Sequence, residues 1–290
     1  FFQAEDGIRA VERSRGLGDV YKRQLFLLGI TLTLFTEGLP AFRTVGFFEF
    51  VFGKSWHPTH EPAEFGILPL ILASLGVTIF ALSIAIPLSL GSAIYISELA
   101  SPRMKEILKP IIELLAGIPS VVYGFFGMVF LAPLVQNTFN LPTGLTWFTA
   151  SIILSIMVVP TITSLAEDAI SAVSKEMREA SFALGATKWE TITRMVVPGA
   201  SSGILTAIIL GMGRAIGETM TVLMVAGGAI MLPKSIFQPV RPMTATIAAE
   251  MGEAPMGSAH YHALFAIALV LFSITLVLNL LANQLSSRKK

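Results

Sequence analysis

Cysteine is absent from this sequence of 290 residues, and charged residues are scarce. The lack of cysteine excludes disulfide bonds, thiolate metal sites and a cysteine nucleophile. Only 13% of the residues are charged, about half of the roughly 25% that a soluble domain carries. By contrast, 53% are hydrophobic, and the mean hydropathy is +0.73. This composition predicts an integral membrane protein.

A nucleotide-binding loop is lacking as well. Such a loop needs G-x-x-x-x-G-K-[ST] after a strand, but Phe48 stands where the leading glycine of the only Gly-Lys-Ser should be. Histidine is rare, and all four copies fall in or beside segments expected outside the bilayer: His57, His60, His260 and His262. We therefore expect no catalytic residues, no metal site and no cofactor in this chain. An intramembrane enzyme is the weaker alternative.

Six apolar segments are present instead, at residues 25–36, 66–97, 107–135, 147–165, 201–230 and 261–282. Backbone groups in lipid must be satisfied internally, so each segment is expected to be a helix. The first spans only 12 residues, about 18 Å of helix, whereas crossing a bilayer takes roughly 20 residues. The expected fold is an all-α membrane protein with about six transmembrane helices, the first of them truncated.

Lysine and arginine are distributed unevenly between the connecting loops. One side of the membrane is expected to carry Arg103, Lys105, Lys109, Lys175, Arg178, Lys188, Arg194, Arg288, Lys289 and Lys290. The other side carries Arg43, Lys54, Lys234 and Arg241, spread over longer stretches. Because basic loops stay in the cytoplasm, both termini are expected to be cytoplasmic in a multi-pass protein.

Residues 1–24 differ from the apolar chain that follows. They are charged, and no apolar core precedes a cleavage site, so they do not form a signal peptide. The string "AEDGIRAVERSRGLGDVYKRQ" resembles a translation of sequencing-adapter DNA that recurs at the ends of unrelated proteins. We expect a non-native or disordered leader, in place of part of the native first helix. The alternative is a basic segment lying at the cytoplasmic face.

The long cytoplasmic loop contains "EASFALGATKWETITRMVVP". Its spacing is E-A-A, three residues, G, nine residues, I-x-L-P, which resembles the coupling loop of bacterial ABC importer permeases. The positions that carry the resemblance are Glu179, Ala180, Ser181, Gly185, Met195, Val197 and Pro198. In that family two short helices meet at the glycine and dock on a separate ATPase subunit. The resemblance implies the type I permease fold of ABC importers.

The residue types in this loop suit a docking role. Gly185 permits a backbone turn that other residues resist, and Phe182, Leu184 and Trp189 offer apolar anchors for a partner. Pro198 is expected to stop the second helix before the fifth span. The alternative is an amphipathic connector lying on the membrane surface.

Two membrane segments sharpen the resemblance. "ELLAGIPSVVYGFFG" at residues 113–127 and "GMGRAIGETMTVLMVAGG" at residues 211–228 are similar to the phosphate-specific importers of the Pst type. The second is closer to the C-type permease than to its A-type sibling. Import of another oxyanion, such as sulfate, molybdate or phosphonate, remains the alternative, as does the A-type permease. A self-contained channel would leave the coupling loop unexplained.

Arg214 and Glu218 place two charges inside the fifth apolar segment. A charge at the bilayer centre costs at least about 2.5–3.5 kcal/mol and usually marks a substrate path. Four residues apart on one helix, the two would share a face, with Glu218 holding Arg214 in place. Arginine presents a fork of donors suited to phosphate. We expect both to line the phosphate path. A structural ion pair is the alternative.

The resemblance also implies an organisation and partners. It divides the chain into a leader at 1–24, a truncated first helix and outer loop at 25–65, a permease core at 66–283 and a cytoplasmic tail at 284–290. The implied partners are a sibling permease, cytoplasmic ATPase subunits that bind ATP and magnesium, an extracytoplasmic phosphate-binding protein, phosphate and membrane lipid. Nucleic acid is not expected. The implied location is a bacterial-type inner membrane.

Overall fold

A computed structural model describes the chain from Phe2 to Ser287. Within the first and last helices it describes the side chains from Gln24 onwards, up to Leu281 and for Gln284. The leader side chains at residues 1–23 and the tail residues 288–290 lie outside the described part, so the sequence-based division at the two ends stays a prediction. The backbone of residues 2–24 is helical and continuous with the first helix.

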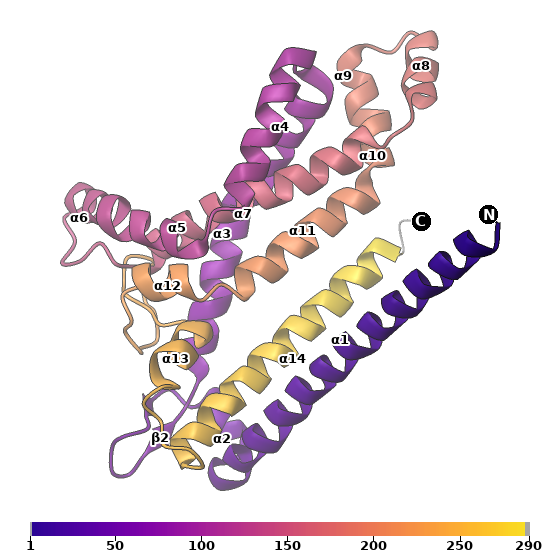
Figure 1. The fold of residues 1–290 in the computed structure, drawn as a ribbon. Helices are drawn as coiled ribbons and strands as arrows, with labels where there is room; N and C mark the ends of the chain where they lie inside the picture. The colour runs from indigo at the N-terminus through magenta and orange to yellow at the C-terminus, as the bar shows by residue number, and fades with distance from the viewer. Residues whose placement is uncertain (1, 288–290) are drawn as a thin grey trace.

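Helices account for most of the described chain (Figure 1). The long ones are α1 (Phe2–Val45), α3 (Leu68–Ile94), α7 (Trp147–Ser171), α11 (Ser201–Ile216) and α14 (Ala259–Ser287). The shorter ones are α2 (Phe47–Phe52), α4 (Pro102–Ala116), α5 (Ser120–Phe126), α6 (Ala132–Phe139), α8 (Lys175–Ala183), α9 (Lys188–Thr191), α10 (Val197–Gly199), α12 (Met220–Val225) and α13 (Met243–Glu250). Three π-helical turns, at Tyr95–Leu99, Gly127–Leu131 and Ile192–Val196, extend α3, α5 and α9. The strands β1 (Trp56–His57) and β2 (Glu64–Phe65) form a small antiparallel hairpin.

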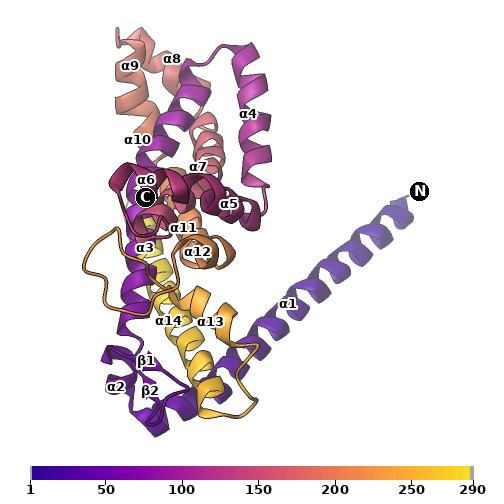
Figure 2. The same ribbon diagram turned by 90° about the vertical axis from the view of Figure 1, so that its left-hand side faces the viewer.

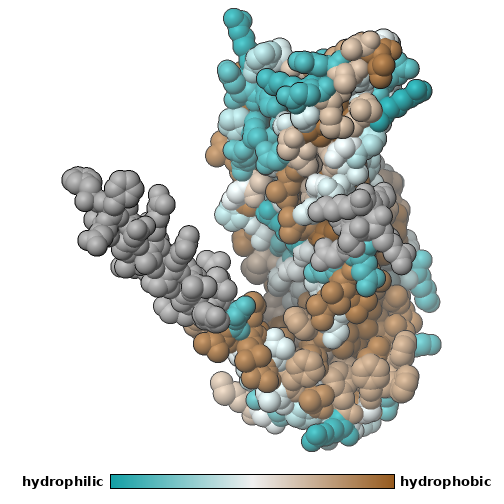
Figure 3. All heavy atoms as spheres, turned by 90° about the vertical axis from the view of Figure 1, so that its right-hand side faces the viewer, coloured by the Kyte–Doolittle hydropathy of each residue, from teal (hydrophilic) through white to brown (hydrophobic). Residues whose placement is uncertain are grey.

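Five helices of the described chain are long and apolar enough to cross a membrane, and a bent pair makes a sixth. The bent pair joins Lys188–Gly199 to Ser201–Ile216 at an angle of 67°. The expectation of about six spans is confirmed. Figure 3 shows hydrophilic side chains gathered at the end that carries α8 and α9, and hydrophobic side chains over the opposite half.

The first span is longer than the sequence predicted. It covers Gln24–Val45, 22 residues, and not the 12 of the apolar run, so the prediction that it is too short to cross was wrong. The helix continues through Glu37, whose charge ended the apolar run. His262 of α14 contacts this residue: its Nδ1 lies 2.9 Å from the Glu37 carbonyl oxygen and 3.4 Å from the Glu37 carboxylate.

Two further segments that the sequence predicted as single spans are broken. In the third, α4 ends at Ala116 and the span begins anew at Ser120, with Gly117 and Pro119 between them. In the fifth, α11 ends at Ile216 and α12 begins at Met220. Gly117 and Pro119 lie in the first break, and Gly217 and Glu218 lie in the second. Both segments remain apolar overall, so an apolar run does not reveal the break.

The core of the protein lies between α3 and α7. Small residues let the two helices approach closely: a Cβ on Gly76 would lie 2.1 Å from Cζ2 of Trp147. A hydroxyl group adds a hydrogen bond between the two helices: Ser89 Oγ donates to the Val159 carbonyl over 3.2 Å. Close packing of small residues and interhelical hydrogen bonds both hold helices together in lipid.

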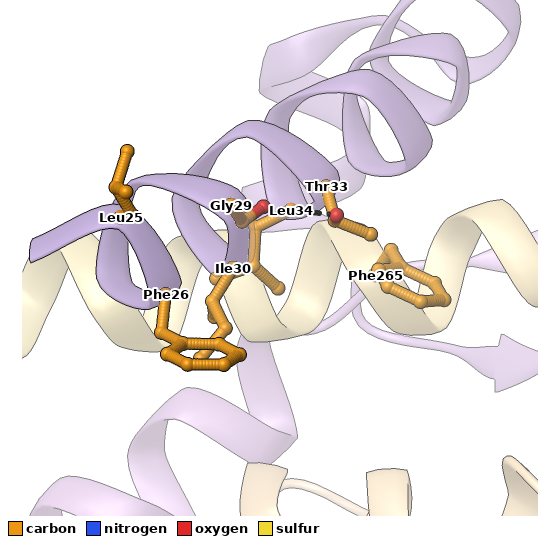
Figure 4. A pocket seen from close by; sticks show the side chains of 7 residues that line it. All are labelled: Leu25, Phe26, Gly29, Ile30, Thr33, Leu34 and Phe265. Carbon is orange, nitrogen blue, oxygen red and sulfur yellow. Dashed lines mark hydrogen bonds between the residues drawn. The ribbon is translucent and has the colours of Figure 1, made fainter. Parts of the chain in front are cut away.

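The helices α1 and α14 pack against each other beside this core. They lie side by side in Figure 1, and Figure 2 shows α1 diverging from the body of the protein toward its N-terminus. A groove of about 600 Å³ remains between them. Its lining is almost wholly apolar and includes Phe26, Ile30, Leu34 and Phe265 (Figure 4). Such a surface suits contact with lipid.

Candidate functional site

Arg214 lies in the last turn of α11 and reaches two neighbouring helices. Its Nη1 donates to Oγ1 of Thr161 on α7 over 2.7 Å. The same nitrogen donates to the carbonyl oxygen of Ala116, the last residue of α4, over 3.3 Å. The C-terminal ends of α11 and α4 therefore both present partial negative charge to the guanidinium, which stabilises the cation.

The Arg214 side chain is half-buried and has no acidic partner. None of the ion pairs between described side chains includes it. Its Nε and Nη2 make no hydrogen bond to the described residues, so these donors are available. A Cβ on Gly213, the preceding residue, would meet nothing within 4 Å, so α11 is open at that position. The donor fork of a guanidinium can bind an anion.

Glu218 does not pair with Arg214, and this part of the prediction was wrong. Helix α11 ends at Ile216, so the two residues do not share a helix face. The Glu218 carboxylate instead accepts a hydrogen bond from the backbone nitrogen of Thr221 over 2.9 Å, which caps the start of α12. The Glu218 carbonyl accepts from Thr244 of α13 over 2.8 Å. Glu218 thus fixes the helix break.

The two helix breaks lie against each other. Helix α5, after the first break, packs on α12, after the second. Thr221 Oγ1 donates to the Ser120 carbonyl over 2.9 Å, which joins the starts of the two helices. Tyr123 bridges its own break, because its hydroxyl donates to the Leu115 carbonyl over 2.9 Å. Arg214 therefore lies where two interrupted helices meet. Irregular backbone at membrane depth is tolerated where it is buried in protein or lines a water-filled path.

The predicted coupling loop consists of two short helices, α8 and α9, that project together at one end of the protein (Figure 1). They meet at Gly185, whose φ of +82° is one that residues with a Cβ rarely adopt. Thr187 and Glu190 form a reciprocal capping box at the start of α9. Ser181 is buried, and its hydroxyl lies 2.9 Å from that of Thr191, which ties the two helices together.

Several apolar side chains are exposed among the hydrophilic residues of this loop. Leu184 is 89% exposed and Trp189 is 63% exposed, and Phe182 is also exposed. Glu179 and Ala180 are exposed on α8 as well. The helical path that contains Pro198 ends one residue later, at Gly199, and a 67° bend separates it from α11.

Ion pairs connect the loop to the membrane helices. Arg178 on α8 contacts Glu98, at the end of the α3 span, over 2.7 Å, and donates to the Ile170 carbonyl of α7 over 3.0 Å. Lys109 of α4 contacts Asp168 over 2.7 Å and Glu167 over 2.9 Å. These hydrogen bonds, that to Asp168 first, raise the pKa of Lys109 above its ordinary value, so its charge persists at neutral pH.

A polar cluster on the opposite end was not predicted. Glu250 of α13 accepts hydrogen bonds from Trp56 over 3.0 Å and from Arg241 over 2.7 Å, and lies 2.9 Å from His260. From the sequence we expected the histidines in or beside segments outside the bilayer, and Glu250 lies on α13. The contact between Trp56 and Glu250 joins residues 194 positions apart, which a local sequence pattern does not reveal.

Comparison with known proteins identifies the family of this chain. A family model for the inner membrane component of binding-protein-dependent transport systems matches residues 85–290. The chain is 41% identical to a probable ABC transporter permease, YqgH, of Bacillus subtilis, over 91% of this chain and 86% of that protein. It is 35% identical to the phosphate transport system permease PstC of Mesorhizobium japonicum, over 91% and 85% of the two chains.

Solved structures share the fold at low sequence identity. A bacterial alginate ABC transporter, in complex with a periplasmic protein carrying an alginate pentasaccharide, aligns with a TM-score of 0.65 and 19% identity, over 97% of this chain and 96% of that one. The methionine ABC transporter MetNI, in an inward-facing conformation, aligns with a TM-score of 0.61 and 16% identity, over 80% of this chain and all of that one.

Proposed function

Because this chain belongs to the family of binding-protein-dependent transport system inner membrane components, we propose that it is a permease subunit of an ATP-driven phosphate importer. It is a multi-pass inner membrane protein with the type I permease fold of ABC importers. Several relatives at 31–35% identity carry the name of the phosphate permease PstC. Phosphate is therefore the substrate that these relatives favour.

Arg214 is the observation that carries the proposal. It is a permanent cation within an apolar region, it has no acidic partner among the described side chains, and it keeps Nε and Nη2 for a ligand. Phosphate is an anion at neutral pH, and hydrocarbon excludes it. A fixed arginine lowers that barrier, and its planar fork matches two phosphate oxygens. Glu218 contributes by holding the break beside Arg214.

The loop formed by α8 and α9 is the proposed contact with a separate ATPase subunit. Its exposed apolar side chains supply the anchors, and the Arg178–Glu98 ion pair carries movement of the loop to the α3 span. Glu179, Ala180, Ser181, Gly185 and Pro198 form its framework. ATP and magnesium are bound by that partner. A sibling permease and an extracytoplasmic phosphate-binding protein complete the proposed complex.

Permeases for sulfate, molybdate or phosphonate are the second candidate, because a single arginine fork accepts any of these oxyanions. The A-type phosphate permease is a further alternative within the same complex. The relatives named PstC favour the C-type.

Arg214 variants test the proposal. The complete complex, reconstituted in proteoliposomes, should lose ATP-driven phosphate uptake in Arg214→Ala while assembling normally. Arg214→Lys keeps the charge without the fork and should retain at most partial uptake. Uptake is normalised to assembled complex in each case. Normal uptake in Arg214→Ala would show that Arg214 does not handle phosphate.

A further inference from the structure

Thr161 is the side chain that Arg214 contacts on α7. Both observed hydrogen bonds of the guanidinium come from Nη1, one to Thr161 over 2.7 Å and one to the Ala116 carbonyl over 3.3 Å. An Nη1 group has two protons, so these two bonds account for both of them. The guanidinium is thereby held between the end of α4 and the middle of α7.

This arrangement selects one edge of the guanidinium. Nε and Nη2 present parallel N–H groups on the side away from the occupied Nη1, and this pair matches two oxygens of a phosphate or carboxylate. With Nη1 occupied, the Nε–Nη2 edge is the bidentate fork that remains. The guanidinium therefore already presents one edge for binding before an anion arrives.

The Thr161 hydroxyl is used differently from those of Thr206 and Thr275. Threonine in a helix commonly donates to the carbonyl four residues earlier. Thr206 does so to Ser202 over 2.9 Å, and Thr275 does so to Leu271 over 2.8 Å. Thr161 makes no such bond to a described residue. Its oxygen is used across the helix interface, as the acceptor for Arg214.

We infer that Thr161 is a positioning residue for anion transport: it holds Arg214 by Nη1 and leaves the Nε–Nη2 edge for the oxygens of the transported anion. The inference rests on the proposed function, since it deepens the role of Arg214 there. Without the hydroxyl, the guanidinium loses a short hydrogen bond and samples other orientations, so binding of the anion must first restrict it. The loss should therefore appear in the KM of uptake.

The test uses the complete complex in proteoliposomes, with inorganic phosphate as the transported ion. Thr161→Val removes the hydroxyl and preserves the shape, and Thr161→Ser preserves the hydroxyl. Thr161→Val should raise the KM for phosphate about tenfold, the size expected for one hydrogen bond to a charged group. Thr161→Ser should stay close to the wild type. Thr206→Val, the same change on the helix that carries Arg214, serves as the matched control and should leave the KM unchanged.

Each outcome is decisive. A wild-type KM in Thr161→Val, with Arg214→Ala inactive, overturns this inference and leaves the proposed function standing. Failure of the wild-type complex to transport phosphate would instead overturn the proposed function. Equal impairment of Thr161→Val and Thr161→Ser, or a loss of assembled complex without a change in KM, assigns Thr161 a structural role and also overturns the inference. Should Thr161→Val not assemble, Thr161→Ala carries the same prediction, and failure of both to assemble counts against it.

Discussion

At the scale of single residues, the two intramembrane charges have separate roles. Arg214 donates hydrogen bonds from Nη1 to a carbonyl and a hydroxyl, whereas the Glu218 carboxylate accepts a hydrogen bond at the start of α12. The sequence identifies both residues, because charges in an apolar segment are conspicuous. It does not reveal that the two side chains have different partners, because the expected pairing assumes an unbroken helix. The helix breaks after Ile216, and the two side chains point to different neighbours.

Glu218 variants separate capping from charge. Glu218→Gln keeps an oxygen for the backbone nitrogen of Thr221, so it should retain uptake within about threefold of the wild type. Glu218→Ala removes the acceptor and should destabilise the start of α12 by about 1 kcal/mol. Thermal stability of the purified complex and uptake per complex measure the two effects. Inactivity of Glu218→Gln would show that the negative charge itself is required.

At the scale of elements, local motifs were predictable and the paths of the apolar segments were not. The resemblance to the coupling loop of ABC importer permeases implied two helices meeting at Gly185, and the positive φ at Gly185 agrees with that expectation. The breaks at residues 117–119 and 217–219 lie in runs that hydropathy reads as continuous. The first span was underestimated because Glu37 interrupts its sequence pattern, while its partner, His262, lies 225 residues away.

Gly185→Ala tests the geometry of the coupling loop. An L-residue in the left-handed region costs about 1–2 kcal/mol, so the turn between α8 and α9 should open. We expect reduced phosphate-stimulated ATP turnover, with the membrane helices still inserted. Gly91→Ala is the matched control, because a Cβ there meets nothing within 4 Å and its φ is not positive. Equal turnover in the two variants would contradict the assigned turn.

At the scale of the whole molecule, composition alone indicated a membrane protein, and the apolar segments indicated about six spans. The polar cluster around Glu250 could not be predicted from the sequence, because it forms only once Trp56, α13 and the start of α14 come together. The orientation of the termini rests on the uneven distribution of lysine and arginine. It remains a prediction.

Topology is tested with reporters. A reporter fused after Ser287 should be cytoplasmic, and one inserted near Thr143, between α6 and α7, should be external. The coupling loop would then lie on the cytoplasmic side, where a soluble ATPase can reach it. The reverse pattern would place α8 and α9 outside the cell and contradict the docking role.

The most direct test of the central claim is ATP-driven accumulation of labelled phosphate by the whole complex. The chain is reconstituted in proteoliposomes with its cognate ATPase, sibling permease and phosphate-binding protein. The account predicts accumulation that requires ATP and that excess sulfate or molybdate does not suppress. Accumulation of sulfate or molybdate in place of phosphate, or phosphate flux that continues without ATP, would contradict it.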